Sequence, residues 1–258
     1  MSLKFDAGYL IAAGEKPFMK AIKTKSYALM QLKKGMTILD IGCGPGLDTL
    51  NMAKIVGAEG NVFGIDADNS MIEIATNEVR KRGLEQNVHH MVSDSTATDF
   101  EDDYFDACRC ERVLQHLSKV EAKQTVAEAM RITKPGGNLV FVDSDWASLS
   151  IHCNNPQLER KITHLFTNSI RNGYAARGLP ELFFQTGITD IKFEIQSMKL
   201  SFSDLNRLLG PLLDVWINKQ LINALSVKKM LDNLISLEES GVFFSTLNII
   251  TCYGRNLA

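Results

Sequence analysis

Three glycines within five residues follow a short apolar run, where residues 37–41 lead into Gly42-Cys43-Gly44-Pro45-Gly46. Glycine lets a backbone turn tightly and approach a ligand closely, and the helix expected after the turn offers free N–H groups to an anion. A P-loop would require Gly-Lys followed by Ser or Thr, and the dinucleotide fingerprint would require glycine where Leu47 stands. The spacing therefore disfavours both phosphate-binding motifs.

A carboxylate stands at the end of the next apolar run, because residues 61–66 close with Asp66, twenty positions after Gly46. A carboxylate at the end of a second strand accepts hydrogen bonds from the two hydroxyls of a ribose. We therefore expect a ligand that contains a ribose and lacks phosphate.

Five segments in order resemble class I S-adenosylmethionine-dependent methyltransferases, and the resemblance covers about residues 35–143. The subgroup that it resembles includes the ubiquinone/menaquinone biosynthesis methyltransferases and related small-molecule enzymes. Each segment falls at the carboxyl end of an expected strand or in the adjoining turn, which makes the set more specific than a lone glycine motif. The segments are Leu39–Gly46, Gly64–Asp66, Ser93–Ser95, Phe105-Asp106 with Glu111–His116, and Lys134–Gly137.

The resemblance implies S-adenosyl-L-methionine as the cofactor and S-adenosyl-L-homocysteine as the product. It implies that the glycine turn holds the methionine moiety and that Asp40 holds the turn and the amino group. Asp66 would bind the ribose, while Ala67 and Met71 would pack on the adenine. The implied cofactor residues are Asp40, Gly42, Cys43, Gly44, Gly46, Asp66, Ala67, Met71, Asp94, Ser95, Glu111 and Arg112.

Some of these assignments have a plain structural alternative. Asp94 and Ser95 would read the adenine edge, but Ser93-Asp94-Ser95-Thr96 is also good turn chemistry. Glu111 and Arg112 would lie beside the methionine end, or they form a solvated ion pair. Cys43 sits inside the glycine turn, where its expected task is to fill space.

Two residues are candidate general bases, namely His116 after the fourth expected strand and Asp145 after the fifth. Methyl transfer from a sulfonium requires a base only if the acceptor must lose a proton before attack. His116 is equally open to a packing or capping role. His89 and His90 point to opposite faces of one strand, so we expect no metal site.

The elements that must position these residues alternate between strand and helix from residue 37 to 143, which is typical of a parallel sheet covered on both faces. We expect strands at 37–41, 61–66, 88–92, 105–110 and 138–142, no strand in 145–187, and an edge strand near 191–195. Helix caps are expected at Ser70, at Ser118 through a capping box with Glu121, and at Asn155 before Pro156.

With the resemblance, this pattern predicts an α/β fold. We expect a Rossmann-like sheet of seven strands, mostly parallel with the last strand antiparallel, with helices on both faces. The single domain 1–258 would comprise an N-terminal helical segment (1–35), a cofactor-binding core (36–143), helical insertions (144–187 and 201–241) and closing strands (188–200 and 242–253). The second insertion reads as a helix broken at Gly210-Pro211.

Composition narrows the partners. The 28 Lys and Arg against 30 Asp and Glu give a net charge of −2, and no basic face for nucleic acid is evident. The five scattered cysteines suit reduced thiols, and no apolar run is long enough to span a membrane. We therefore expect a cytoplasmic protein whose partner is a small molecule, with a homodimer as a further option.

The acceptor is inferred mostly by exclusion. No Asn-Pro-Pro-Tyr follows the fourth strand, and no Pro-Cys pair offers a cytosine-directed nucleophile. The leucine-rich stretch 205–221 and the apolar residues of 158–166 could form a lid over the crevice. The alternatives are that these helices pack on the sheet or form a dimer interface. We expect methyl transfer to a small, hydrophobic acceptor. The alternatives are a non-catalytic S-adenosylmethionine-binding protein, a methyltransferase acting on protein or RNA, and, least favoured, an NAD(P)-dependent dehydrogenase.

Overall fold

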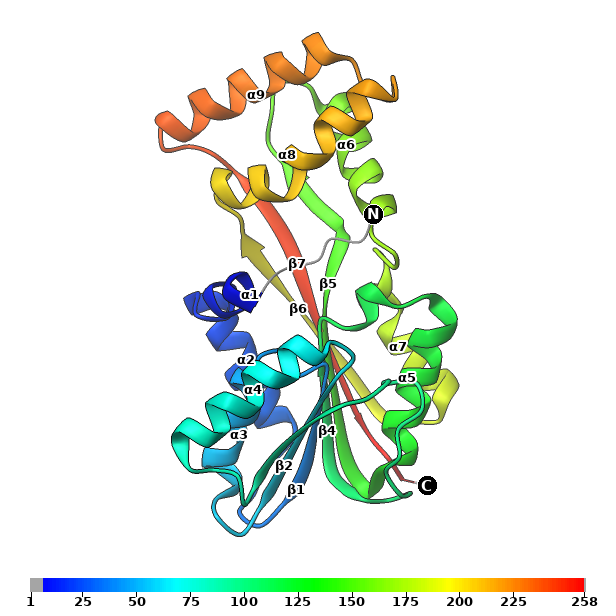
Figure 1. Ribbon diagram of the computed structural model, residues 1–258. Helices are drawn as coiled ribbons and strands as arrows, with labels where there is room; N and C mark the ends of the chain where they lie inside the picture. Colours follow the sequence, from blue (N-terminus) through cyan, green and yellow to red (C-terminus); the bar gives the residue numbers. More distant parts are fainter. Residues whose placement is uncertain (1–6, 258) are drawn as a thin grey trace.

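The sheet of the computed structural model, which describes residues 7–257, has seven strands in the order β3-β2-β1-β4-β5-β7-β6 (Figure 1). The first five strands are parallel, and β7 runs antiparallel to both β5 and β6. The expected Rossmann-like sheet, with β6 at its edge, is confirmed. The strands are β1 (Thr37–Ile41), β2 (Asn61–Asp66), β3 (Val88–Val92), β4 (Phe105–Glu111), β5 (Thr133–Ile151), β6 (Thr189–Lys199) and β7 (Ser245–Arg255).

Five helices, α4, α5, α6, α8 and α9, begin at a polar residue whose side chain accepts a hydrogen bond from the first turn. Ser118 and Glu121 form the expected capping box, and Asn155 caps the helix that Pro156 opens. The predicted cap at Ser70 is wrong, because Asp68 is the cap and accepts from the Ser70 N–H. The helices are α1 (Ala7–Gly14), α2 (Pro17–Leu29), α3 (Leu47–Val56), α4 (Asn69–Arg82), η1 (Leu114–His116, a 3₁₀ turn), α5 (Lys119–Arg131), α6 (Pro156–Ser169), α7 (Ala175–Thr186), α8 (Phe202–Asn218) and α9 (Ala224–Glu239).

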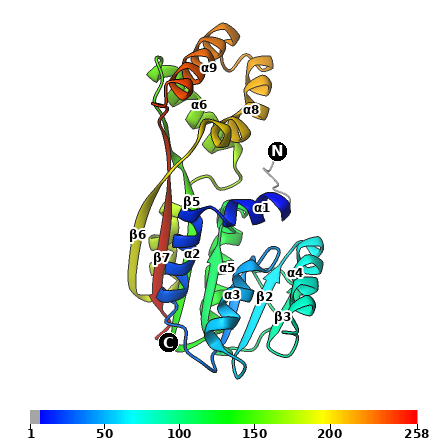
Figure 2. The ribbon, with the colours of Figure 1, turned by 90° about the vertical axis from the view of Figure 1, so that its left-hand side faces the viewer.

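Helices cover both faces of the sheet, as Figure 2 shows from the side. Alternate residues of a strand point to opposite faces, so Ile38 packs with α2, α3 and α4 while Leu39 packs with α5 and α7. Residues 1–6 of the expected N-terminal segment 1–35 lie outside the described range, and residues 7–29 supply α1 and α2.

The expectation that residues 145–187 contain no strand is wrong, because β5 continues to Ile151. Its extension pairs with β7 as far as Ile151 opposite Ser245, across a register shift between Asp145 and Ser150. That bulge breaks the alternation, since the buried apolar residues fall at Trp146, Leu149 and Ile151. The strand was therefore hidden from a search for period-two patterning.

The break expected at Gly210-Pro211 is also wrong, because α8 runs through both residues and ends at Asn218. A proline inside a helix costs about 3 kcal/mol. Leu205 and Trp216 are buried on either side of it, so tertiary packing outweighs that cost. The chain turns instead after α8, and Asn223 caps α9.

Helices α6, α8 and α9 form a separate apolar layer on the extended ends of β5 and β7 (Figure 1). Most leucines of α8 face this layer, while Leu221 is partly exposed. Most of the predicted lid residues therefore serve helix packing, although Leu208 also lines the cavity described below. Within residues 7–257, no helix is both long and apolar enough to cross a membrane.

Candidate functional site

A cavity of about 1210 Å³ lies at the carboxyl ends of β1, β2, β3 and β4 and continues toward α8. Ten of the twelve predicted cofactor residues line it, and Asp40 and Gly46 do not. Four of the five segments that carried the family resemblance therefore contribute residues to one site, whereas Lys134–Gly137 lies at the start of β5 and does not line the cavity. Among the described residues, no cluster of three or more His, Cys, Asp or Glu side chains is suited to a metal ion.

The glycine turn has a backbone that other residues adopt only with strain. Gly42, Gly44 and Gly46 have φ values of 71°, 52° and 79°. A Cβ on Gly42 would lie 2.2 Å from Val113 Cγ2, and one on Gly46 would lie 2.8 Å from Ala75 Cβ. The turn is thus packed against its neighbours on one side while its backbone borders the cavity on the other.

Asp66 holds this turn from the neighbouring strand. Its Oδ2 accepts from the Gly44 N–H at 2.9 Å, and its Oδ1 accepts from the Asp68 N–H at 2.9 Å. A carboxylate oxygen accepts more than one hydrogen bond, so both oxygens retain capacity for ligand hydroxyls. Ala67 and Met71 line the cavity beside it.

Asp94 and Ser95 lie in a turn after β3 and also line the cavity. Asp94 Oδ1 accepts from both the backbone N–H and the hydroxyl of Thr96, each at 2.8 Å, and these bonds lower the pKa of the carboxyl. Ser95 Oγ lies 3.0 Å from Thr125 Oγ1. Asp94 therefore stabilises a turn and lines the cavity, so the two alternatives considered for it do not exclude each other.

Asp40 lies beneath the turn, opposite Arg109 of β4 in the parallel register. Both side chains point toward α2, where Arg109 donates from Nη1 to Asp40 Oδ1 at 2.8 Å and from Nε to Ser26 Oγ at 2.9 Å. Arg109 Nη2 also donates to Glu111. Burial raises the pKa of Asp40 to about 6, despite the opposing charge of Arg109.

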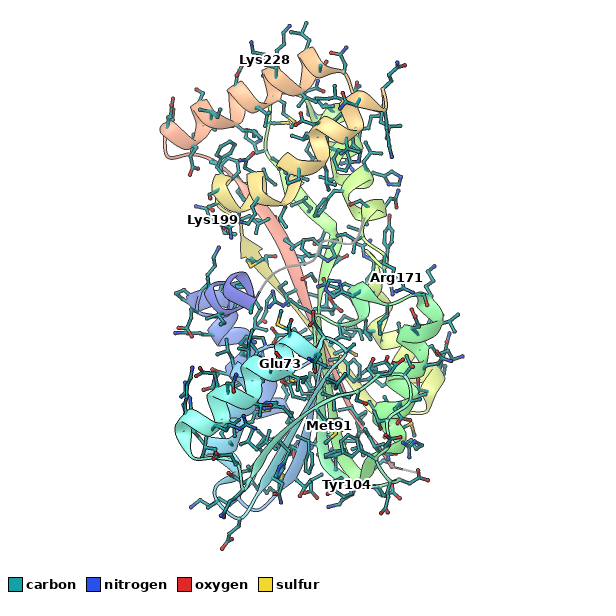
Figure 3. All side chains as sticks on the ribbon, viewed as in Figure 1. Glu73, Met91, Tyr104, Arg171, Lys199 and Lys228 are labelled. Carbon is teal, nitrogen blue, oxygen red and sulfur yellow. The ribbon has the colours of Figure 1, made fainter. Side chains whose placement is uncertain are left out.

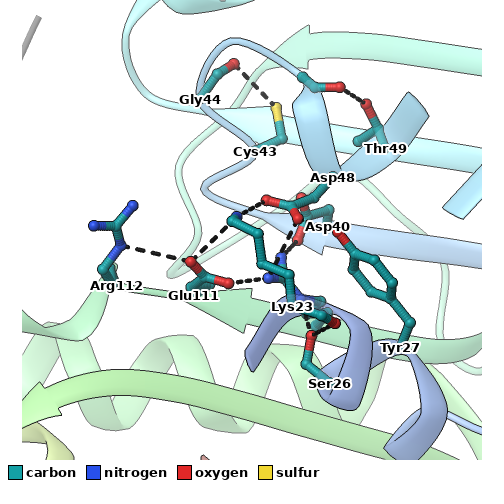
Figure 4. A network of polar contacts seen from close by, with 12 residues as sticks. Lys23, Ser26, Tyr27, Asp40, Cys43, Gly44, Asp48, Thr49, Glu111 and Arg112 are labelled. Carbon is teal, nitrogen blue, oxygen red and sulfur yellow. Dashed lines mark hydrogen bonds and ion pairs between the residues drawn. The ribbon is translucent and has the colours of Figure 1, made fainter. Parts of the chain in front are cut away.

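Lys23 of α2 completes this cluster by pairing with both Asp48 and Glu111 (Figure 4). Burial raises the pKa values of Asp48 and Glu111, but Arg109 and Lys23 outweigh it and leave both below their usual range. Glu111 Oε1 is buried, lies 3.2 Å from Lys23 Nζ, and accepts no hydrogen bond within residues 7–257. Glu111 thus lines the cavity with its Oε1 between the cations of Lys23 and Arg112, whereas Asp40 is engaged below it.

The two candidate bases lie in different settings. His116 lines the cavity, with its pKa lowered by burial and by Arg112. Asp145 does not line the cavity, and its two oxygens accept from Arg177 Nε at 2.9 Å and Nη2 at 2.7 Å. A bidentate pair thus holds the Asp145 carboxylate outside the cavity, which disfavours a role as a base.

The upper half of the cavity is formed by residues that sequence reasoning missed. They come from α1 and α2, the end of β6, and β7, and most are apolar; they include Ala13, Phe18, Met19, Met198, Leu200, Leu247 and Ile249. Arg171 and Lys199 line opposite sides of this half (Figure 3). No motif marked these residues, because only the fold brings the chain ends and the insertions together.

Comparison with known proteins agrees with this geometry. Residues 38–137 match the family described as methyltransferase domain. The chain carries a class I S-adenosylmethionine-dependent methyltransferase domain. A solved structure of YcgJ from Bacillus subtilis resembles it with a TM-score of 0.63 and 19% identity, over 93% of this chain and 99% of that one. At that identity the likeness shows the fold.

Two relatives in sequence extend the comparison. A 37.1 kDa protein in transposon TN4556 of Streptomyces fradiae is 33% identical over 70% of this chain and 52% of its own length. The ubiquinone/menaquinone biosynthesis C-methyltransferase of Vibrio campbellii is 31% identical over 43% of this chain and 42% of its own. The chain spans about half the length of these relatives or less.

Proposed function

We propose that the protein transfers a methyl group from S-adenosylmethionine to a small, largely apolar acceptor. The observation that carries this proposal is a single cavity with two kinds of wall. Its lower half is formed by the methyltransferase motifs, and its upper half by apolar residues of α2, β6, β7 and α8. A cofactor and an acceptor would therefore meet inside one enclosed space.

The charges of the lower half suit this cofactor. Asp66, Asp94 and Glu111 are carboxylates at the wall, and they favour a ligand with a ribose diol, an ammonium and a sulfonium. A dinucleotide would place a pyrophosphate beside these acids, which is unfavourable. Glu111 is the strongest candidate for the ammonium, since its Oε1 accepts no hydrogen bond from residues 7–257.

When bound, S-adenosylmethionine supplies a methyl group activated on a sulfonium. The task left to this chain is to hold the nucleophile on the methyl axis and to exclude water, and such positioning is worth about 7–11 kcal/mol. Gly42 and Gly44 hold the turn beneath the cofactor, while Met198 and Leu208 enclose the acceptor. None of these tasks requires the Asp145 carboxylate.

The upper wall favours a small molecule over a protein or RNA acceptor. Its cations are largely paired, with Lys16 2.5 Å from Asp204 and Arg171 2.7 Å from Glu121. An RNA acceptor would require several unpaired cations along an open groove. The residues that line this half instead suit an apolar body with few charged groups.

Calorimetry with S-adenosylhomocysteine and with NAD tests the cofactor assignment. We expect binding of S-adenosylhomocysteine, and we expect Asp66→Ala to weaken it by about 100-fold, because two hydrogen bonds to a charged acceptor are worth about 3 kcal/mol together. Glu59→Ala removes an exposed acid before the start of β2, at the opposite end of that strand from Asp66 and outside the cavity, so it serves as the control and should leave the affinity unchanged. Preferential binding of NAD would refute the assignment.

A screen of small-molecule acceptors with cofactor labelled in the methyl group then tests transfer. Transfer to an apolar acceptor supports the proposal. The competing reading is a protein that binds the cofactor without transferring its methyl group. Tight binding of S-adenosylhomocysteine with no transfer to small molecules, proteins or RNA would favour that reading over ours.

A further inference from the structure

Three side chains at the cavity wall form a hydrogen-bonded series, namely Trp146, Gln115 and His116. Trp146 Nε1 donates to Gln115 Oε1 at 2.6 Å, and Gln115 Nε2 lies 3.1 Å from His116 Nε2. Trp146 and Gln115 are buried, and the indole packs edge-on against Phe166 at 5.4 Å between centroids. The first two members are therefore fixed in place by packing.

The orientation of the Gln115 carboxamide follows from its neighbours. An indole N–H only donates, so the amide atom that faces Trp146 must be the oxygen. On the other side, Gln115 Nε2 donates to the carbonyl oxygen of Arg112 at 3.2 Å, and a carbonyl only accepts. Both neighbours specify the same orientation of the amide.

That orientation decides where His116 carries its proton. An amide nitrogen only donates, so His116 Nε2 must be the unprotonated acceptor, and the neutral ring carries its proton on Nδ1. A protonated ring would set the Nε2–H of His116 against the amide N–H of Gln115, which is unfavourable. Burial and the charge of Arg112 lower the pKa of His116, and the charge of Asp66 opposes them. The ring is thus held neutral in one tautomer.

We propose that Trp146 and Gln115 hold His116 as the Nδ1–H tautomer, so that His116 donates a hydrogen bond to an oxygen of the methyl acceptor and is not a base. The hydrogen bond to Gln115 engages Nε2, no side chain within residues 7–257 forms a hydrogen bond with Nδ1, and His116 lines the cavity. The acceptor class is a molecule with a carbonyl, ether or anionic oxygen near the methylated atom. The role toward the acceptor rests on the proposed function, and the tautomer does not.

The tautomer is measured by long-range ¹H–¹⁵N NMR on the full chain, with the His116 signals assigned by their loss in His116→Asn. We expect protonated Nδ1 and unprotonated Nε2 at neutral pH. Gln115→Glu replaces the donor by an acceptor, so the proton should move to Nε2 and the pKa of His116 should rise. Gln115→Met, of similar length, should release the ring into a mixture of tautomers.

Two NMR results would overturn the proposal. One is an Nε2–H tautomer in the wild-type protein, and the other is an unchanged His116 spectrum in Gln115→Glu. Near-UV circular dichroism of each variant shows whether it is folded. Because these spectra need neither cofactor nor acceptor, they remain decisive even if no methyl transfer is found, in which case the proposed function fails and the tautomer assignment stands.

The activity measurement separates a donor from a base. His116→Ala should lower kcat/KM by about tenfold, as expected for one lost hydrogen bond, whereas loss of a base would cost about 10²–10⁴-fold. His116→Asn should recover most of the loss, because its amide N–H falls near the place of Nδ1–H. His116→Gln, whose amide falls near Nε2, should not. A loss of 10²-fold or more in His116→Asn would refute the donor role.

A second and independent observation concerns the edge strand β6. Phe193 and Ile195 are 55% and 57% exposed on the face shared with α7, and no strand within residues 7–257 pairs with the outer edge of β6. Figure 2 shows this edge free along its length. Long edge strands with exposed apolar residues pair readily with another strand.

The sequence of β6 is complementary to itself in one register. Antiparallel pairing centred on Phe193 sets Lys192 opposite Glu194 of the partner subunit, twice by symmetry, and Ile191 opposite Ile195 of the partner subunit. Centring on Glu194 would instead oppose two like charges. We propose that two copies of this chain pair through β6 in the Phe193-centred register.

Analytical ultracentrifugation over a concentration series tests this pairing. We expect a dimer for the wild-type chain and a monomer for Lys192→Glu. The dimer should be recovered in Lys25→Glu/Lys192→Glu/Glu194→Lys, where the charges are exchanged and the ion pair between positions 25 and 194 is kept. Ser197→Ala, on the same strand outside the charged pairs, is the control and should remain dimeric. A monomeric wild-type chain, or a dimer unaffected by Lys192→Glu, would refute the proposal.

Discussion

Removing Arg109 tests how the floor of the cofactor half is stabilised. The side chain is 1% exposed, donates to Ser26, Asp40 and Glu111, and lies over the ring of Tyr27 at 5.4 Å. Arg109→Met fills a similar volume without the charge and leaves buried carboxylates without their main cation. Breaking a buried ion pair from one side costs about 3–5 kcal/mol, a large share of the about 5–15 kcal/mol of a typical domain.

The stability lost in Arg109→Met should depend on pH, and the direction follows from the pKa values of the carboxylates left without a cation. Without Arg109, the folded-state pKa values of Asp40 and Glu111 rise, while their unfolded values stay the same. The folded variant then binds more protons than the unfolded chain at intermediate pH, so its stability falls as pH rises. The destabilisation relative to wild type should therefore be larger at pH 8 than at pH 5.

Urea unfolding followed by tryptophan fluorescence measures both quantities. Arg109→Lys is the matched control: it keeps the charge, but one ammonium cannot replace the forked guanidinium, so a smaller loss with less added pH dependence is expected. In Asp40→Asn/Arg109→Met the cost should be less than the sum of the single variants. A cost below about 1 kcal/mol, or one equal at both pH values, would refute the reasoning.

Three further predictions concern single sites. Gly42→Ala should destabilise the fold by about 1–3 kcal/mol in urea unfolding, and in a Val113→Ala background only the backbone cost of about 1–2 kcal/mol should remain, because the 2.2 Å contact is gone. Asp145→Asn should leave the pH profile of kcat unchanged in the methyl-transfer assay, since Asp145 is paired with Arg177 outside the cavity. If the variant lost one limb of that profile, Asp145 would be a base after all. Burial raises the pKa of Asp143 from 3.8 to about 7, so the free energy of unfolding should fall as the pH rises from about 4 to 7. Asp143→Asn should flatten this slope in urea unfolding at several pH values. An unchanged slope would contradict the prediction.

The features predicted well from sequence are those decided by neighbouring residues. The glycine turn, the capping box of Ser118 and the alternation of β6 depend on local chemistry, and each occurs where the pattern placed it. The same locality explains the errors. A bulge after Asp145 concealed the end of β5, and distant apolar contacts carried α8 through Pro211.

The partnership of Asp40 with Arg109 required long-range information. The resemblance implies that Asp40 holds the turn and the amino group, and the register of β1 against β4 sets it opposite Arg109. An arginine in the middle of an apolar strand was a signal that something charged faced it, because a buried guanidinium requires partners. The identity of the carboxylate that pairs with Arg109 depends on the register between two strands. The residues that flank Asp40 and Arg109 in the sequence do not specify that register.

The division of the cavity explains why family membership leaves the acceptor open. The matched region, residues 38–137, holds the glycine turn, Asp66, Asp94 and Glu111, which form the cofactor half. The walls of the upper half, where we propose that the acceptor binds, come mainly from outside it, from α1, α2, β5, the ends of β6 and β7, and α8. Because the cofactor already carries an activated methyl group, the protein needs few catalytic groups of its own. The choice of acceptor should then depend on the shape and hydrogen bonds of that upper wall. Acceptor specificity should therefore change with substitutions at positions such as Met198 and Leu208, which leave the cofactor motifs intact.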